Sequence, residues 1–212
     1  NEINAHPHAT DRVALVHNGI IENFQELRAE LEEDGRELAS ETDTEVIAHM
    51  ITHNLEAGMA PAQATHETLK RLEGAFALGI VFAGHHGLMI GARLGSPLAV
   101  GFGEGEMFLG SDAPALAPLT KQIMYLEDGD WAVINDNGAT VYDLAGDEVT
   151  RQVRLTEHSG AAIGKAGYRH FMLKEIYEQP QVIGDTLHNY VSQADRKLTL
   201  PDLAIDLAAV SK

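Results

Sequence analysis

The sequence predicts a layered α+β domain rather than a doubly wound parallel sheet. Helical periodicity fills most of residues 20–72, and short apolar runs separated by glycines follow from residue 75 to residue 144. Helical periodicity then returns in residues 168–191. A doubly wound sheet would instead alternate single strands with helices along the chain. We therefore expect antiparallel hairpins and meanders that pack against helices.

The first elements are a strand and a helix. Residues 12–17 contain an apolar run that is typical of a buried strand. Residues 20–34 place apolar side chains at helical spacing, and Gly35 supplies a C-terminal stop. Between the two periodic segments stand Asn18 and Gly19, which are polar or small and interrupt the apolar pattern.

Two further helices are expected before the strands begin. Thr42 and Glu45 fit a capping box at the start of one helix, which ends near Gly58. Pro61 suits the first turn of the next helix. From residue 75 onward, four apolar runs and three more in residues 121–144 predict short strands, with a turn signal at Asn137-Gly138.

The segment GFGEGE at residues 101–106 could form either a dinucleotide-binding loop or a hairpin turn. It lacks the spacing of G-x-G-x-x-G, and the apolar run after it is typical of a strand rather than a helix. We interpret it as a hairpin turn. Residues 156–167 are rich in Gly, Ala and Ser and predict an exposed connector, and the helix after it is expected to break or restart at Pro180.

Composition excludes several classes of function. The 212 residues carry 15 basic and 32 acidic side chains, and the net charge of −17 argues against nucleic acid and anionic membranes as partners. There is no cysteine, so disulfides, thiolate metal sites and a cysteine nucleophile are absent from these residues. No apolar stretch is long enough to span a bilayer, and no signal peptide is evident. We therefore expect a cytoplasmic protein.

Asn18 and Gly19 are the leading candidates for chemistry. An asparagine amide and an unobstructed glycine N–H can together stabilise a developing oxyanion, worth roughly 3–4 kcal/mol per donor. The alternative is an ordinary Asn-Gly turn. Helical periodicity rather than a second strand follows the pair, which weakens the hairpin form of that alternative.

Asp43 is the second candidate, because it lies at the predicted start of a helix. A carboxylate there can hold a substrate ammonium, or it can simply stabilise the helix terminus by about 1 kcal/mol. His49 and His53 have the spacing of a helical zinc pair, but Met50 stands where the glutamate of H-E-x-x-H would be. We expect neither a metal nor a cofactor.

Six segments, taken in order, resemble one family. They are NAHPH (4–8), HNGIIEN (17–23), SETDTEVIAH (40–49), ARLGSPLAVG (92–101), LGSD (109–112) and YRHFMLKEIYEQP (168–180). Together they resemble the glutaminase domain of the glutamine:fructose-6-phosphate aminotransferases (glucosamine-6-phosphate synthases), which are class II, N-terminal-nucleophile amidotransferases. The resemblance extends roughly to Leu187. An Asn-Gly step after a strand is shared by several class II amidotransferases. The segments ETDTEVIAH and RHFMLKEIYEQP are much more specific to the glutamine:fructose-6-phosphate aminotransferases.

The resemblance implies a fold, a reaction and three site residues. The fold is an αββα sandwich of two antiparallel sheets. In the reaction an N-terminal cysteine attacks the side-chain amide of L-glutamine, and the ammonia passes to a C-terminal sugar-isomerase domain. That domain converts fructose 6-phosphate to glucosamine 6-phosphate for UDP-N-acetylglucosamine biosynthesis, in an enzyme implied to be a homodimer. By resemblance, Asn18 and Gly19 form the oxyanion hole, and Asp43 holds the α-ammonium of glutamine.

The sequence departs from the family pattern because its cysteine, first strands and arginine-tryptophan motif match nothing here. We expect residues 1–155 to form the glutaminase domain without those strands. Residues 156–192 would be a connector and helices that complete it, and residues 193–212 a linker toward the isomerase domain. On this interpretation the chain alone is inactive. Two alternatives stay open: a non-catalytic module that binds glutamine or a partner, and another class II amidotransferase, such as a purine or asparagine enzyme.

Overall fold

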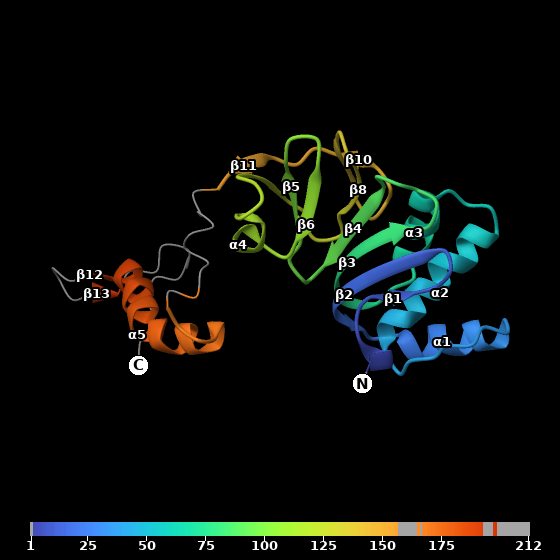
Figure 1. Ribbon diagram of the computed structural model, residues 1–212, viewed down its shortest axis with the longest axis horizontal. Helices are drawn as coiled ribbons and strands as arrows, with labels where there is room; N and C mark the ends of the chain where they lie inside the picture. The colour runs from blue at the N-terminus through green and yellow to red at the C-terminus, as the bar shows by residue number, and fades with distance from the viewer. Residues whose placement is uncertain (1, 157–164, 166, 193–196, 199–212) are drawn as a thin grey trace, which may run out of the picture. The chain divides into compact units, whose positions relative to one another are not determined.

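The structure is a computed structural model that describes residues 2–156, 165, 167–192 and 197–198. The chain divides into two compact units, residues 1–162 and residues 163–212. The first unit contains two antiparallel sheets with their helices, as Figure 1 shows.

The larger sheet of the first unit has seven strands in the order β1-β2-β3-β4-β8-β9-β10, each antiparallel to its neighbours. These strands are β1 (His8–Ala9), β2 (Val13–Ile21), β3 (Gly74–Phe82), β4 (Met89–Leu94), β8 (Trp131–Asn135), β9 (Gly138–Tyr142) and β10 (Glu148–Val149). β2 and β3 pair along their whole length, from Val13 opposite Phe82 to Ile21 opposite Gly74. The β2–β3 ladder therefore runs without interruption through Asn18 and Gly19.

The smaller sheet has four strands in the order β11-β7-β5-β6. They are β11 (Val153–Leu155), β7 (Gln122–Tyr125), β5 (Ala99–Phe102) and β6 (Met107–Gly110). The GFGEGE segment joins β5 to β6 as a hairpin, as predicted. Every glycine-separated apolar run after residue 75 forms a strand, so the prediction of antiparallel hairpins is confirmed.

Three helices cover one face of the larger sheet (Figure 1). They are α1 (Phe24–Glu33), α2 (Asp43–Glu56) and α3 (Pro61–Leu69), preceded at the N-terminal side by a 3₁₀ turn at Glu2–Asn4. Helix α1 begins four residues later than the periodicity predicts, because β2 continues through Ile20 and Ile21. In the strand these two neighbours face opposite sides, with Ile21 fully buried against the helices and Ile20 66% exposed.

The two sheets pack against each other through a second apolar core, which includes Ala77, Leu98, Val100, Met124 and Ile134. Alternate residues of the smaller sheet face the other way and contact the short helix α4 (Ala113–Leu116). The layers of this unit are therefore helices, larger sheet, smaller sheet and α4. The expected sandwich of two antiparallel sheets is confirmed.

The second unit contains α5 (Phe171–Tyr190), whose ribbon bends in Figure 1, and the strands β12 (Val191–Ser192) and β13 (Lys197–Leu198). The sequence predicts that the helix breaks or restarts at Pro180, but α5 continues through it as one helix. Most of the predicted connector and most of residues 193–212 lie outside the described residues. None of the helices in the described ranges has the length and hydropathy that a membrane span requires.

Candidate active site

Asn18 and Gly19 lie inside β2, paired with Ala77 and Phe76 of β3. The sequence predicts that these two residues follow the strand, whereas in the structure they lie within it, in a continuous ladder with β3. No Asn-Gly turn forms at this point, and the alternative of an ordinary turn is wrong. The exposed side chain of Asn18 faces the side of the sheet opposite to that of its buried neighbour His17.

Gly19 has a backbone that only glycine adopts without strain, with φ +141°. A Cβ atom at this position would lie 2.0 Å from the carbonyl oxygen of Ala75 on the neighbouring strand. Gly74 is in the reciprocal situation, with φ +118° and a virtual Cβ 2.3 Å from the carbonyl oxygen of Ile20. The close approach of the two strands therefore requires glycine on both sides.

The N–H of Gly19 points away from β3. Backbone N–H groups alternate between the two edges of an antiparallel strand. The N–H of Glu22 donates to Glu73 at the end of the β2–β3 ladder, whereas the N–H of Ile21 donates to the Asp43 carboxylate at 2.8 Å. Gly19 stands two residues before Ile21 and shares its edge. Among the described residues, β1 pairs with that edge only as far as Leu15, so the edge beside Gly19 is open.

Asp43 is the first residue of α2, and its carboxylate is directed at the edge of β2. Its Oδ2 accepts the Ile21 N–H, and its Oδ1 accepts the Thr44 hydroxyl at 3.3 Å. The helix is capped by Thr42 instead, whose hydroxyl oxygen accepts the N–H of Glu45. Side-chain capping is therefore not the role of Asp43, and its carboxylate remains 21% exposed.

His17 lies beneath Asp43 and is almost completely buried, with 2% of its side chain exposed. Its Nδ1 is 3.0 Å from the Thr44 hydroxyl and 3.8 Å from Asp43 Oδ1. Burial lowers the pKa of His17, Asp43 opposes that shift, and His6 and His8 reinforce it, so the net pKa is below its ordinary value. His17 is therefore neutral at pH 7 and leaves the negative charge of Asp43 uncompensated.

The other histidines of the helical layer do not converge. His49 Nε2 lies 3.7 Å from Glu45, and His53 Nδ1 lies 3.9 Å from Asp34. Within the part of the chain that the structure describes, no group of three histidine, aspartate or glutamate side chains is placed to hold a metal ion.

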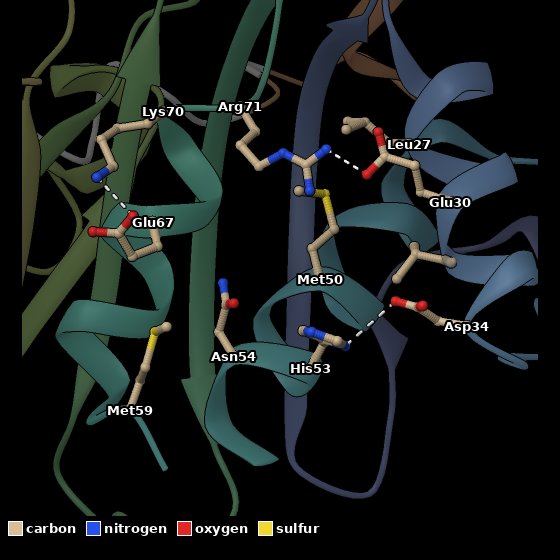
Figure 2. Close-up of a pocket in the computed structure, with 11 residues that line it drawn as sticks. Leu27, Glu30, Asp34, Met50, His53, Asn54, Met59, Glu67, Lys70 and Arg71 are labelled. Carbon is tan, nitrogen blue, oxygen red and sulfur yellow. Dashed lines mark hydrogen bonds and ion pairs between the residues drawn. The ribbon is translucent and has the colours of Figure 1, made fainter. Parts of the chain in front are cut away.

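Two cavities of similar size differ in their relation to these residues. One, of about 190 Å³, lies between the sheets and is lined by His17, Asn18, Leu109 and Ser111 among others. The other, of about 230 Å³, is a groove among α1, α2 and α3 that contains none of the predicted site residues (Figure 2). The site is therefore assigned by its chemistry and not by its volume.

Comparison with known proteins identifies the family. Residues 4–118, more than half of the chain, match the family described as "Glutamine amidotransferase domain". The chain belongs to this family. Asn18, Gly19 and Asp43 all lie inside the region that matches this family.

Relatives and solved structures agree with this assignment. Proteins named glutamine–fructose-6-phosphate aminotransferase [isomerizing] are 53% identical over 211 residues in Brucella abortus and 56% identical over 198 residues in Bradyrhizobium diazoefficiens. These matches cover 100% and 93% of this chain but 35% and 33% of the relatives, so the chain spans about a third of their length. A glutamine phosphoribosylpyrophosphate amidotransferase from B. subtilis, solved with ADP and GMP, gives a TM-score of 0.54 at 28% identity, covering 62% of this chain and 29% of that one.

The sequence does not predict the contacts that surround Asp43. It predicts Glu45 only as half of a capping box, yet the Glu45 carboxylate bonds to Ala39 and Ser40 rather than back to Thr42. The contact of His17 with Thr44 joins residues 27 positions apart. A local pattern gives no signal for either arrangement.

Proposed function

We propose that this glutamine amidotransferase domain hydrolyses the side-chain amide of L-glutamine and supplies the ammonia to fructose 6-phosphate within a longer protein. The product would be glucosamine 6-phosphate. The relatives that carry the corresponding name are 49–56% identical to this chain, against 28% identity for the phosphoribosylpyrophosphate enzyme. That difference favours the hexosamine reaction over the purine one.

The observation that carries the proposal is one edge of β2, which the Gly19 N–H faces and on which Asp43 accepts the Ile21 N–H. Ile21, whose N–H holds Asp43, lies two residues from Gly19, about 7 Å along the strand. In an extended glutamine the α-nitrogen and the side-chain carbonyl carbon are four bonds apart, about 5 Å. A glutamine whose ammonium contacts Asp43 therefore reaches the Gly19 N–H with its carbonyl oxygen.

Each residue would have a distinct role in the reaction. A cysteine thiolate from outside these 212 residues would attack the amide carbon, forming a C–S bond and a tetrahedral oxyanion. Asn18 Nδ2 and the Gly19 N–H would donate to that oxyanion. As the intermediate collapses, the C–N bond would break and the nitrogen would take up the proton that the thiol gave up, so that it leaves as ammonia. Water would then hydrolyse the thioester to glutamate. Asp43 would hold the α-ammonium throughout, aided by the neutrality of His17.

We propose that the other part of the longer protein binds fructose 6-phosphate as a sugar isomerase. We also propose that the longer protein assembles as a homodimer and works in the cytoplasm. The one-third coverage of the relatives supports a further functional part. The 212-residue chain without a cysteine is expected to release no ammonia from glutamine.

The decisive experiment uses the full-length gene product with L-glutamine and alternative ammonia acceptors. Glucosamine 6-phosphate should form from fructose 6-phosphate, and no phosphoribosylamine should form from 5-phosphoribosyl pyrophosphate. Formation of phosphoribosylamine would instead assign a purine-type amidotransferase. Binding of glutamine without ammonia release by the full-length protein would support the non-catalytic alternative.

A further inference from the structure

Glu45 is a buried carboxylate that neither the family assignment nor the proposed reaction uses. It is the third residue of α2, two positions after Asp43, and only 7% of it is exposed. Its carboxylate accepts the N–H of Ala39 at 2.8 Å, the N–H of Ser40 at 2.6 Å and the Ser40 hydroxyl at 2.7 Å. A buried charge with three donors is an arrangement that fixes the donors in place.

The direction of the hydrogen bonds around Glu45 follows from its charge. An ionised carboxylate only accepts, so the Ser40 hydroxyl must donate its single proton to Glu45. The Thr42 hydroxyl, 2.9 Å from Ser40 Oγ, then donates to Ser40. His8 Nε2 lies 3.1 Å from Thr42 Oγ1 and so connects β1 to these hydroxyl groups. Two hydroxyl donors in series, Thr42 and then Ser40, therefore end on one negative charge.

The charge of Glu45 is maintained by these donors. Burial acts to raise the pKa of Glu45, but the hydrogen bonds from the Ser40 hydroxyl and from the N–H groups of Ala39 and Ser40 lower the pKa by more, and nearby His49 adds to this. Glutamine at this position would have the same shape but only one acceptor oxygen, and its NH₂ would face at least one N–H donor. The carboxylate is therefore required, not merely a side chain of this size.

The segment held by Glu45 is the one that delivers Asp43. The carbonyl oxygen of Ser40 also accepts Arg28 Nη1 of α1 at 2.8 Å, so Ser40 is bonded from both sides of the loop. Thr42, fixed to Ser40, forms the N-cap, and Asp43 follows immediately as the first helical residue. The orientation of Asp43 toward Ile21 thus depends on the loop that Glu45 ties down.

We propose that Glu45 is a positioning residue for glutamine recognition, which holds residues 39–42 so that Asp43 presents its carboxylate to the α-ammonium of the substrate. The inference rests on the proposed role of Asp43. Glu45 acts through Asp43 and touches neither the substrate nor the reacting atoms.

The test compares two substrates in the full-length enzyme carrying Glu45→Gln. L-Glutamine has the α-ammonium, whereas glutaramate (5-amino-5-oxopentanoate) lacks it but has the same scissile amide. We expect KM for L-glutamine to rise about tenfold, the size of effect that loss of a charge-assisted hydrogen bond produces, with kcat within about twofold. KM for glutaramate should not change.

Four further variants make the outcomes distinguishable. Glu41→Gln, the same chemical change at an exposed position of the same loop, should leave both KM values unaltered. Asp43→Asn should raise KM for L-glutamine, and adding Glu45→Gln to it should produce no further rise. If Glu45→Gln does not fold, Ser40→Ala removes one of the three donors and should give a smaller rise in the same direction.

Three results would overturn the role of Glu45 or the role of Asp43 on which it rests. If Asp43→Asn raises KM for L-glutamine but Glu45→Gln does not, the positioning role is wrong and the proposed function stands. If Glu45→Gln impairs both substrates to the same extent, its role is only structural and the inference is wrong. If Asp43→Asn leaves KM for L-glutamine unchanged, the proposed role of Asp43 fails first.

Discussion

The edge of β2 and the groove among α1, α2 and α3 both contain carboxylates, yet the charges around these carboxylates are arranged differently. In the groove each acid has a cationic or histidine partner: Glu30 contacts Arg71 at 2.5 Å, Glu67 contacts Lys70 at 2.6 Å and Asp34 lies near His53, as Figure 2 shows. At the edge of β2, Asp43 is surrounded by an N–H, a hydroxyl and a neutral histidine.

This difference separates a binding site from a solvated surface. Paired surface charges satisfy one another and contribute at most about 1 kcal/mol. An unpaired carboxylate held by neutral donors keeps its affinity for an external cation, and here it lies on the same strand edge as the Gly19 N–H. Charge without an internal partner, rather than cavity volume, marks the candidate site.

The largest expected effect comes from Gly19→Ala, because the new Cβ would lie 2.0 Å from the Ala75 carbonyl oxygen. We expect a loss of about 3 kcal/mol or more in the free energy of unfolding. Denaturation followed by fluorescence of Trp131, the single tryptophan, measures it. Gly35→Ala is the matched control, since φ is +80° there but no atom lies within 4 Å of the virtual Cβ. It should cost only about 1 kcal/mol. Equal losses for the two variants would show that the close strand approach does not matter.

Asn18→Ala should come next, with a reduction in kcat of about 10²-fold in the full-length enzyme. The side chain is exposed and makes no packing contribution to the buried core, so folding should be retained. Steady-state ammonia release measures kcat and KM, and KM should stay near the wild-type value because the amide acts on the transition state. A wild-type kcat would remove Asn18 from the oxyanion hole.

Asp43→Asn should raise KM for L-glutamine about thirtyfold, because a desolvated charge contact is worth about 2 kcal/mol. The change keeps the shape of the side chain and one acceptor for the Ile21 N–H. Asp34→Asn is the matched control from the groove, where the carboxylate interacts with His53. If Asp43→Asn and Asp34→Asn have the same KM for L-glutamine, the unpaired charge of Asp43 does not distinguish the edge of β2 from the groove.

Much of the fold and part of this site can be predicted from the sequence. Glycine-separated apolar runs identify the strands, and the ordered motifs point to Asn18, Gly19 and Asp43 by resemblance. The extent of β2 cannot be predicted locally, since Ile20 and Ile21 suit either a helix or a strand. Pairing with Gly74, more than 50 residues away, decides between them. The hydrogen bonds that connect His8, Thr42, Ser40 and Glu45 are also non-local, because they join β1 to a loop that precedes α2.

The buried charge of Glu45 also predicts a pH dependence of stability. Its pKa in the folded chain is lower than the ordinary value of 4.5. The folded state therefore binds this proton less readily than the unfolded state, so the stabilisation is present above pH 4.5 and is lost as the pH falls through the lower, folded pKa. The difference in free energy of unfolding between wild type and Glu45→Gln should shrink between pH 6 and pH 3. A constant difference over that range would show that the charge is not what Ser40 and Ala39 require.

The smallest expected effect is in the groove. Arg71→Ala removes the partner of Glu30, but both side chains are about half exposed, so the free energy of unfolding should change by no more than about 0.5 kcal/mol. The backbone carbonyl of Arg71, which accepts Asn23 Nδ2 at 2.9 Å, is unaffected by the substitution. Kinetics with L-glutamine should equal those of wild type, because neither Asp43 nor any residue of β2 lines the groove. A change in KM comparable to that of Asp43→Asn would mean that the groove belongs to the glutamine site, and that paired charges there do not exclude a ligand.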